Sequence, residues 1–327
     1  MGKIADWDDH IGRRLRLRDL RVFFAVMQSG SLTKAAAHLR VSHPAVSQVI
    51  ADLEHTLGVK LFDRSSRGVE PTLYARALLE RGRAAFNELK QGIRDIEFLA
   101  DPTAGELTIG YTLSIADTLL PQIVELFSGK YPRVVMRANI VPTPSFKFPG
   151  LRDRTYDLIF TRIPAPFPDD DALNDLNVEV LFDDPWVLAA CTNSRWARRR
   201  KVDLAELLDE PWIMPPSDTA GYFIVAEAFK ARGLVMPTPT LVTYSMDLRV
   251  KSSARGRFIT VVPKSVLRHG DDRHDLKELA VDMPMRPWPV AILTLKNRTL
   301  SPVVERFIEC GREVASSMAP NDSRRKR

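Results

Sequence analysis

The stretch from Leu17 to Thr72 constrains the fold more than any other part of this sequence, because apolar residues and turn signals alternate in it at short intervals. A first helix is predicted by apolar residues that recur every three or four positions, namely Leu17, Leu20, Phe23, Phe24 and Met27. Gly30 then breaks the chain, and Ser31 is a suitable N-cap for a second helix. Ser42 caps a third helix, which tolerates Pro44 in its first turn. Three short helices joined by tight turns are therefore expected.

The third of these helices has two different faces. Its apolar residues would bury one face on the first two helices, whereas His43, Ser47 and Gln48 project from the other. Two helices joined by a tight turn, with a polar N-terminal face on the second, form the arrangement that places side chains in the major groove of DNA. We expect His43 and Gln48 to contact base edges and Ser47 to contact mainly phosphate.

A basic hairpin is predicted directly after the third helix. Gly58 ends that helix, residues 59–62 predict a short strand, residues 63–68 a turn and residues 69–70 a return strand. Arg64 and Arg67 fall at the tip, where arginine can bind phosphate or enter the minor groove. The alternative is that they are ordinary charged turn residues. The full set of expected DNA contacts is Ser31, Thr33, Ser42, His43, Pro44, Ser47, Gln48, Arg64 and Arg67.

The charge of the chain supports a polyanionic partner for this region. The whole sequence has a formal net charge of +6. Residues 12–68 contain ten Lys or Arg against four Asp or Glu, so this segment alone carries that excess. The expected partner of the segment is therefore double-stranded DNA, although a solvated basic surface would show the same charge.

A long helix is predicted from Thr72 to Leu99, about 40 Å at 1.5 Å per residue. Two sets of residues repeat along it at sevenfold spacing: Leu79, Phe86 and Ile93, and Gly82, Leu89 and Ile96. Such a seam is typical of a helix that lies along a second helix, with glycine allowing close approach. We interpret it as a dimerisation helix; the alternative is a helix packed on its own domain.

The remainder of the chain alternates between strand and helix patterns. Residues 101–105 form a turn-rich linker, and Ser114 is expected to cap a helix that runs to about Lys130. The expected strands are residues 107–111, 134–141, 157–161, 186–191, 212–214 and 258–262, with a further helix near 223–232. Alternating strands and helices predict α/β units with mainly parallel sheets.

These segments closely resemble LysR-type transcriptional regulators. The matching sequence segments are LRDLRVFFAV, GSLTKAAAHLRVSHPAVSQVIADLE, LGVKLFDRSSRGVEPT and GELTIGYTLSIADTLLP. The resemblance covers almost the whole chain and is most specific in the first hundred residues. It implies a winged helix-turn-helix that is mostly α-helical, a linker helix that dimerises, and an α/β effector domain with two lobes, similar to periplasmic binding proteins.

The resemblance also implies domain limits. We expect a DNA-binding domain at 12–71, a linker helix at 72–100, an effector-binding domain at 105–318 and a basic tail at 319–327. Lobe I would comprise about 105–176 and, as the resemblance implies, a return segment at 281–318. Lobe II would comprise about 177–280. A homodimer or homotetramer is expected.

A small molecule is expected to bind between the two lobes. Ligands of open α/β sheets bind beyond the carboxyl ends of strands, often at helix N-termini. The candidate contacts are Thr112, Ser114, Thr143, Ser217, Thr219 and Arg257. The resemblance implies the roles of Ser114 and Thr143, whereas each hydroxyl is also an ordinary cap or turn residue. Arg257 replaces a small glycine that the family tends to have; it could bind a carboxylate or face solvent. Asp117, near the helix terminus, would disfavour an anionic ligand there.

The remaining signals argue against other classes of protein. The six histidines show no metal-ligand spacing, and no nucleophile elbow, phosphate-binding loop or catalytic carboxylate pair is present, so neither metal, cofactor nor enzymatic activity is expected. The sequence shows no membrane span or signal peptide, which favours a cytoplasmic protein. Two alternatives remain: a regulator whose crevice is vestigial, and a small-molecule enzyme or binding protein that uses its N-terminal domain only to dimerise.

Overall fold

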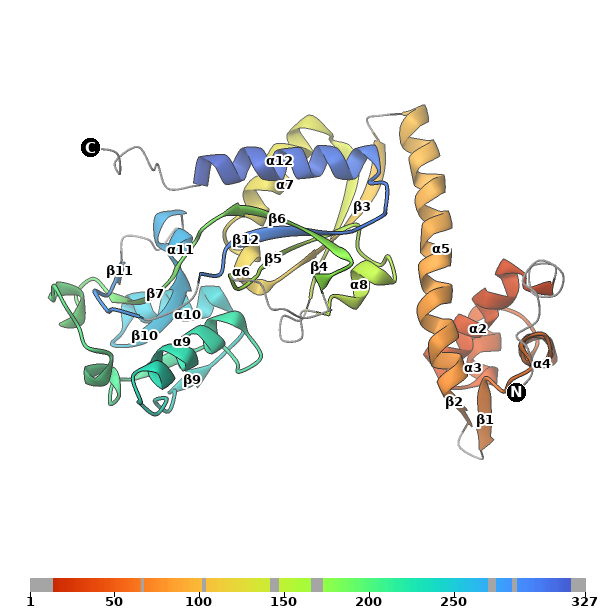
Figure 1. Cartoon of the computed structure of the whole chain (residues 1–327), viewed down its shortest axis with the longest axis horizontal. Coiled ribbons are helices and arrows are strands. Elements are labelled where there is room, and N and C mark those ends of the chain that lie inside the picture. The colour runs from red at the N-terminus through yellow and green to blue at the C-terminus, as the bar shows by residue number, and fades with distance from the viewer. Residues whose placement is uncertain are drawn as a thin grey trace. The chain divides into compact units, whose positions relative to one another are not determined.

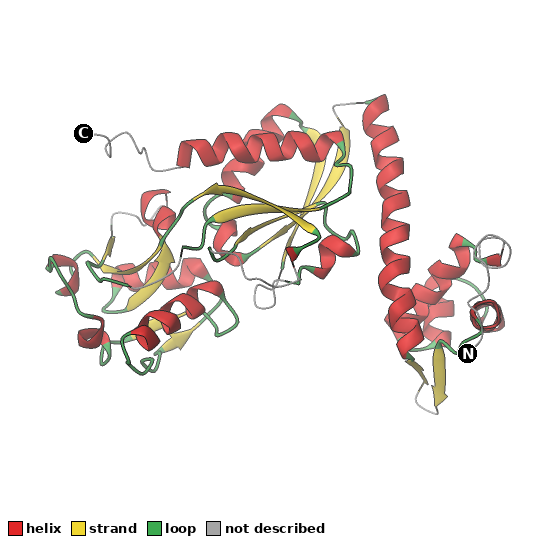
Figure 2. Cartoon of the chain, viewed as in Figure 1, coloured by secondary structure: helices red, strands yellow, loops and turns green. Residues whose placement is uncertain are grey.

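The structure is a computed structural model of the chain (Figure 1). It describes residues 14–65, 68–101, 104–141, 147–165, 173–269, 275–283 and 287–318. The chain divides into two compact units, residues 1–92 and 93–327. Helices dominate the first unit, and the second contains both helices and two separate sheets (Figure 2). No helix in the described ranges is long and apolar enough to cross a membrane.

The first unit contains the three predicted helices and the predicted hairpin. They are α2 (Leu17–Ser29), α3 (Leu32–Leu39), α4 (His43–Leu57), β1 (Phe62–Ser65) and β2 (Gly68–Pro71). Gly30 and Gly58 follow α2 and α4 in the left-handed conformation that glycine adopts without steric cost. The side chains of Ser31 and Ser42 accept hydrogen bonds from the amides of Lys34 and Ala45, so both predicted N-caps are confirmed.

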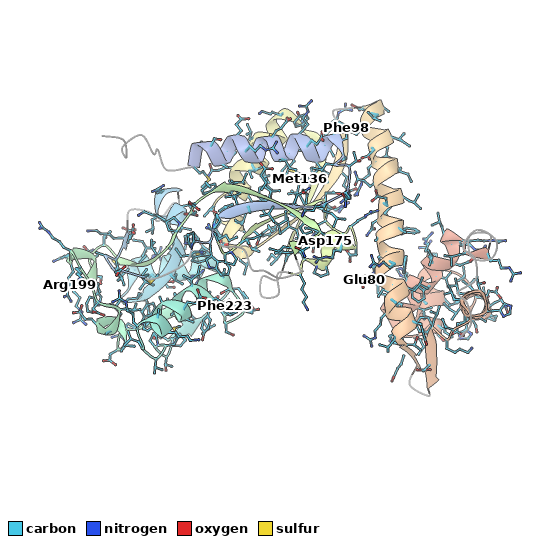
Figure 3. All side chains as sticks on the ribbon, in the orientation of Figure 1. Glu80, Phe98, Met136, Asp175, Arg199 and Phe223 are labelled. Carbon is cyan, nitrogen blue, oxygen red and sulfur yellow. The ribbon has the colours of Figure 1, made fainter. Side chains whose placement is uncertain are left out.

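A single long helix, α5 (Leu73–Ala100), follows the hairpin. The amide of Ala75 donates to the hydroxyl of Thr72, which therefore stands at the start of the helix as predicted. At the other end, Phe98 (labelled in Figure 3) is buried in the first core of the second unit, where it packs against Gly105. The last turn of α5 is thus part of the second unit.

The first sheet of the second unit has the strand order β4-β3-β5-β12-β6. Its strands are β3 (Ala104–Tyr111), β4 (Arg133–Ile140), β5 (Leu158–Arg162), β6 (Leu176–Phe182) and β12 (Val290–Leu295). β3 pairs in parallel with β4 and β5, whereas β12 runs antiparallel to β5 and β6. Helices α7 (Leu120–Lys130) and α12 (Pro302–Met318) cover one face, and α8 (Pro149–Arg152) packs on the other (Figure 1).

The second sheet has the order β11-β7-β10-β8-β9. Its strands are β7 (Trp186–Cys191), β8 (Trp212–Met214), β9 (Leu241–Val242), β10 (Ile259–Pro263) and β11 (Leu276–Glu278). Helix α9 (Ala220–Ala231) packs on one face, and α10 (Met246–Arg255) and α11 (Lys264–His269) pack on the other. Both sheets belong to the second unit. We call the part of this unit around the first sheet lobe I and the part around the second sheet lobe II.

Three sequence predictions about this region were wrong in detail. β6 belongs to the first sheet through its pairing with β12, so lobe I extends to Phe182 rather than to about residue 176. The sheets are mixed rather than mainly parallel. The helix expected from Ser114 to Lys130 is interrupted: α6 (Leu113–Ala116) ends before α7 begins. Pro121 lies in the first turn of α7, and its missing N–H and bulky ring prevent an uninterrupted helix through this point.

Candidate DNA interface and effector pocket

Helix α4 presents the predicted polar face. His43, Pro44 and Gln48 are exposed, and Ser47 is half-buried. The opposite face, through Val46 among others, is buried in the core formed with α2 and α3. Ser31 and Ser42 serve as helix caps, and Thr33 is exposed in the first turn of α3. The N-terminal end of α4 is therefore exposed along the side that carries the residues expected from the sequence to contact DNA bases.

The side chain of Gln48 forms a hydrogen bond within its own helix. Its Nε2 donates to Oδ1 of Asp52, one turn later, at 2.8 Å. An amide group has two N–H donors and a carbonyl acceptor, so one donor and the acceptor remain. Those two groups are the pair that glutamine uses to read the N7 and N6 atoms of adenine.

The hairpin is attached to α4 by a buried carboxylate that sequence reasoning did not single out. Oε1 of Glu54 accepts from the amides of Leu61 at 2.8 Å and Phe62 at 3.2 Å, and Oε2 accepts from Nζ of Lys60 at 2.8 Å. Burial alone would raise the pKa of Glu54. The ammonium of Lys60 and the two amides outweigh that effect and hold the pKa below its ordinary value of 4.5. The sequence signal that could have identified Glu54 is a glutamate on the helix face where the other residues are apolar.

A second contact fixes the base of the hairpin against the turn between α2 and α3. The amide of Val69 donates to the carbonyl of Gly30 at 3.2 Å. A Cβ at Gly68 would lie 2.7 Å from the same carbonyl oxygen, so only glycine permits this approach. The backbone of Arg64 lies in β1, but its side chain and the whole of Arg67 lie outside the described residues. Their proposed contacts with DNA stay predictions.

The seam of α5 separates into two parts. A Cβ at Gly82 would lie 3.2 Å from the ring of Phe24, and the ring of Phe86 meets Phe24 edge-on at 6.0 Å. Leu79 also packs on the core of the helix-turn-helix. Gly82 and Phe86 face the chain's own α2, and Leu79 faces the helix-turn-helix core, so the expectation that Gly82 admits a partner helix is corrected. The exposed part of the seam consists of Leu89, Ile93 and Ile96, which are 50%, 59% and 68% exposed.

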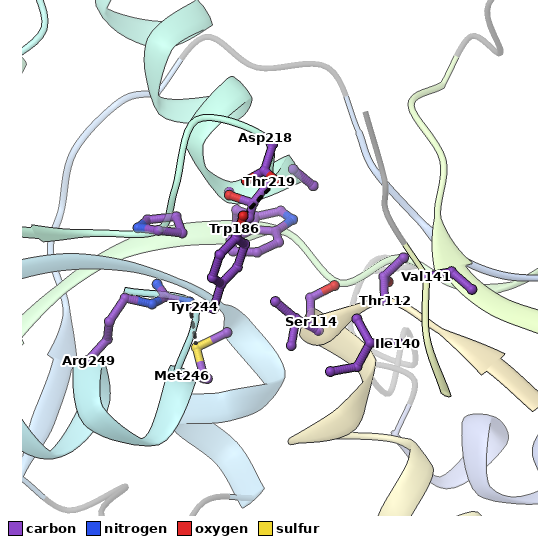
Figure 4. Close-up of a pocket in the computed structure, with 14 residues that line it drawn as sticks. Thr112, Ser114, Ile140, Val141, Trp186, Asp218, Thr219, Tyr244, Met246 and Arg249 are labelled. Atoms are coloured by element: carbon purple, nitrogen blue, oxygen red, sulfur yellow. Dashed lines mark hydrogen bonds between the residues drawn. The ribbon is translucent and has the colours of Figure 1, made fainter. Parts of the chain in front are cut away.

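A pocket of about 390 Å³ lies between lobe I and lobe II (Figure 4). Thr112, Ser114 and Thr219, all predicted, line it. Ser217 and Arg257 are exposed and do not line this pocket, and Thr143 lies outside the described residues. The other lining residues are Leu113, Ile140, Val141, Trp186, Pro215, Asp218, Ala220, Gly221, Tyr244, Met246 and Arg249. Most of the wall is apolar, as in small-molecule sites generally.

Ser114 belongs to a buried polar network that joins the two lobes beside this pocket. Nε of Arg162, at the end of β5, donates to Oγ of Ser114 at 3.2 Å. The same guanidinium donates to the carbonyl of Asp184 at 2.8 Å and to its Oδ2 at 2.5 Å. From lobe II, the amide and hydroxyl of Ser265 donate to the carboxylate of Asp184 at 2.8 and 2.5 Å. The pocket hydroxyl therefore contacts the same ion pair that connects the lobes.

Arg249 is a pocket residue that the sequence prediction missed. It is only 3% exposed, and Nη1 donates to the carbonyl of Val261 at 2.6 Å while Nη2 lies 3.1 Å from the sulfur of Met246. Met246, Arg249 and Ser253 form the buried face of α10 at spacings of three and four. An arginine on the buried face of an amphipathic helix was the signal that could have identified it.

Two carboxylates lie near the pocket. Oδ2 of Asp218 accepts from the hydroxyl of Tyr244 at 2.7 Å, and this bond raises the pKa of Tyr244. Burial raises the pKa of Asp117, the charge of Arg249 opposes that rise, and Asp247 adds to it.

Among the described residues, no group of three or more His, Cys, Asp or Glu side chains could hold a metal ion.

Two protein families match the chain in consecutive segments. The family described as "Bacterial regulatory helix-turn-helix protein, lysR family" matches residues 17–76. The family described as "LysR substrate binding domain" matches residues 100–316. Together they cover the helix-turn-helix, its hairpin and both lobes.

Regulators of known name are similar over nearly the full length. The HTH-type transcriptional regulator GbpR of Azospirillum brasilense is 26% identical over 298 residues, which are 91% of this chain and 85% of GbpR. The transcriptional dual regulator GltC of Bacillus subtilis is 27% identical over 300 residues, 90% of this chain and 96% of GltC. The HTH-type transcriptional regulator TdcA of Escherichia coli is 25% identical over 312 residues, 92% of this chain and 94% of TdcA.

Solved structures show the same fold. CbnR, a LysR family transcriptional regulator, matches with a TM-score of 0.64 and 22% identity over 92% of this chain and 100% of CbnR. CbnR has also been solved in complex with its target DNA. A full-length OxyR from Pseudomonas aeruginosa matches with a TM-score of 0.64 and 22% identity, over 93% of this chain and 96% of OxyR.

Proposed function

Because the chain belongs to the LysR family of transcriptional regulators, we propose that it binds promoter DNA as a homodimer or homotetramer and that a small molecule between its lobes modulates this binding. The protein is a regulator rather than an enzyme, as its named relatives are. Its action on DNA implies a cytoplasmic location.

The main support for the proposed response to a ligand is the composition of the pocket wall. Thr112 and Ser114 come from lobe I at the end of β3, whereas Thr219 and Arg249 come from helices of lobe II. A molecule that contacts both sets binds better when the lobes are closed on it. Such differential affinity is what allows a ligand to shift a conformational equilibrium.

The DNA-binding part of the proposal rests on α4 and α5. Two copies of α4 would read two half-sites with dyad symmetry, through His43 and Gln48 on base edges and Arg64 and Arg67 on the backbone or minor groove. The exposed apolar part of the α5 seam would pair the two chains, because a stripe of large apolar side chains gains free energy when it is covered.

The experiment is footprinting on the DNA that flanks the gene, with and without a panel of small acids, amides and amines. Wild-type protein should protect an interrupted dyad and change its footprint with at least one compound. Ser114→Trp should still bind the operator but not respond, because an indole would fill the space beside Thr112. Ser217→Trp is the matched control, since Ser217 is exposed in lobe II and does not line the pocket.

The outcomes separate the proposal from its main alternative. A folded Ser114→Trp protein that responds with the wild-type midpoint would place the ligand elsewhere. A wild-type protein that binds its operator identically with every compound would instead favour a constitutive regulator with a vestigial crevice. Thermal melting of both tryptophan variants shows whether either has simply lost its fold.

A further inference from the structure

Helix α4 carries one exposed acidic residue on the side that is expected to face DNA. The helix contains two acids, and Glu54 is buried against the hairpin, so Asp52 is the exposed one. Asp52 follows Gln48 by four positions, which places both side chains on one face of the helix. Among the described residues, the ion pairs of this unit involve Asp19 and Glu54 but not Asp52. An unneutralised carboxylate on this face repels the DNA phosphates and weakens binding to any sequence.

The described partner of Asp52 is the side-chain amide of Gln48. Nε2 donates to Oδ1 at 2.8 Å, and both side chains are exposed to solvent. An ionised carboxylate only accepts hydrogen bonds, so the opposite orientation of the amide would bring Oε1 against Oδ1 with no proton between them. The hydrogen bond is therefore possible in only one of the two amide orientations. It also uses one of the two N–H groups of Gln48.

The groups that remain on Gln48 distinguish the two purines. Adenine presents N7 as an acceptor and N6 as a donor in the major groove, and these match one N–H and Oε1 of the amide. Guanine presents two acceptors, N7 and O6, so a glutamine binds it by donating both N–H groups or by turning Oε1 away. Each of these routes needs the N–H or the orientation that the hydrogen bond to Asp52 takes. The pair thus favours adenine over guanine at the base that Gln48 contacts.

The alternative role for this pair is to stabilise the exposed surface of α4. A polar pair four positions apart adds a little to the stability of any helix, whatever the helix binds. However, Lys or Arg at position 52 would attract the phosphates, and an uncharged residue would not repel them. A helix that served affinity alone would gain from either change. A carboxylate at this position is therefore better explained by selectivity than by affinity.

Building on the proposed function, we propose that Asp52 is a specificity-determining residue: it positions the amide of Gln48 so that the amide reads adenine and rejects guanine. Asp52 acts through Gln48 rather than on a base. Its charge lowers the affinity for all DNA, while its hydrogen bond increases the difference between the cognate sequence and others. Specificity is a difference of affinities, so one residue can raise specificity and lower affinity together.

The test is the selection of binding sites by full-length protein from a library of duplexes with a randomised segment. Gln48→Ala first identifies the base at which Gln48 acts, because that variant loses the preference at this position. Titration then compares duplexes with adenine or guanine there. The variants are Asp52→Ala, which removes the acceptor, and Asp52→Glu, which keeps a carboxylate. Glu70→Ala is the control, because it removes an exposed carboxylate of the same unit from β2.

We expect the wild type to bind the adenine duplex at least about tenfold more tightly than the guanine duplex. This preference should fall to about threefold or less in Asp52→Ala, be largely retained in Asp52→Glu and be unchanged in Glu70→Ala. Asp52→Ala should also bind random DNA about two- to fivefold more tightly, because a repulsive charge is lost. Melting temperatures should match the wild type, since the pair is exposed.

Three outcomes would overturn the inference. A folded Asp52→Ala protein with the wild-type purine preference would leave the pair with a structural role only. Loss of a preference for cytosine at a neighbouring position, with the purine preference intact, would mean that Asp52 contacts a base itself. If Gln48→Ala changes no base preference, base readout by Gln48 fails and this inference fails with it. Loss of purine discrimination in Gln48→Ala but not in Asp52→Ala rejects the role of Asp52 alone.

Discussion

Replacing Glu54 with alanine should loosen the hairpin from helix α4. Glu54 is a buried side chain of α4 that binds the amides of Leu61 and Phe62 at the start of β1. Without it, two buried N–H groups lose their acceptor, and no other described side chain makes a hydrogen bond to either amide. The base of the hairpin would then be held by the core contacts of Leu61 and Phe62 and by the hydrogen bond from Val69 to Gly30.

The magnitude follows from those two amides. A buried donor left without a partner costs about 1–3 kcal/mol, and entry of water relieves part of this, so we expect a loss of about 2–4 kcal/mol in the unfolding free energy of the helix-turn-helix unit. The bond to Lys60 adds little, because that side chain is 77% exposed. Glu54→Gln keeps a carbonyl acceptor for both amides and should cost only about 1 kcal/mol.

The stabilisation that the Glu54 carboxylate provides should decrease as pH falls. Glu54 has a lowered pKa in the folded unit, so the unfolded chain takes up a proton there more readily as pH falls. The stabilisation by the carboxylate is complete well above 4.5 and is lost as pH falls through the lowered folded pKa. The difference between wild type and Glu54→Gln should therefore shrink below pH 4.5.

Hydrogen exchange of the full-length protein measures this locally. Amides of residues 58–65 should exchange about 30- to 900-fold faster in Glu54→Ala, the ratio that corresponds to 2–4 kcal/mol. Glu70→Ala removes an exposed carboxylate from β2 and is the matched control, expected within about 0.5 kcal/mol of wild type. Exchange in Glu54→Ala that equals the control would refute the reasoning.

Three further variants test the remaining assignments. Gln48→Ala should cost about 1–3 kcal/mol on operator DNA and little on random DNA, measured by titration at one salt concentration; equal losses would reject base readout. Leu89→Asp should dissociate the oligomer in sedimentation experiments, because it places an unpaired charge in the seam, while Lys90→Asp should not; an intact Leu89→Asp assembly would exclude the seam. Asp184→Asn should lower the unfolding free energy of the second unit by about 3 kcal/mol in urea titrations, since it leaves a buried arginine without its counter-charge; an unchanged midpoint would contradict this role.

The parts that sequence reasoning predicted well are those that local chemistry determines. Ser31 and Ser42 cap helices wherever helices start there, and Gly30 and Gly58 end them by their own conformational freedom. The helix from Leu73 to Ala100 was predicted within one residue at each end because its apolar repeat is long. These features depend on residues a few positions apart.

The parts that were missed depend on contacts distant in sequence. Gly82 was assigned to a partner helix because its spacing fits a seam, yet its neighbour is Phe24 of the same chain. Arg249 was missed because helix α10 itself was not predicted, so the exposed Arg257 was chosen as the candidate cation of the crevice instead. Periodicity shows that a face is buried, but not against what.

Strand β5 has a charged cluster at each end. At one end Arg162 holds Ser114 and Asp184; before the other, Asp157 accepts from Arg298 at 3.0 Å and lies 3.7 Å from Nη2 of Arg94 on the last turns of α5. All five residues of β5 are buried, and the strand spans about 16 Å between the two clusters. If this strand transmits ligand binding to α5, thermodynamic linkage requires the reverse as well. Operator DNA must then change the affinity for the effector by the same factor by which the effector changes the affinity for DNA. A dissociation constant for the effector that is measured without DNA therefore differs from the constant that applies to the DNA-bound protein.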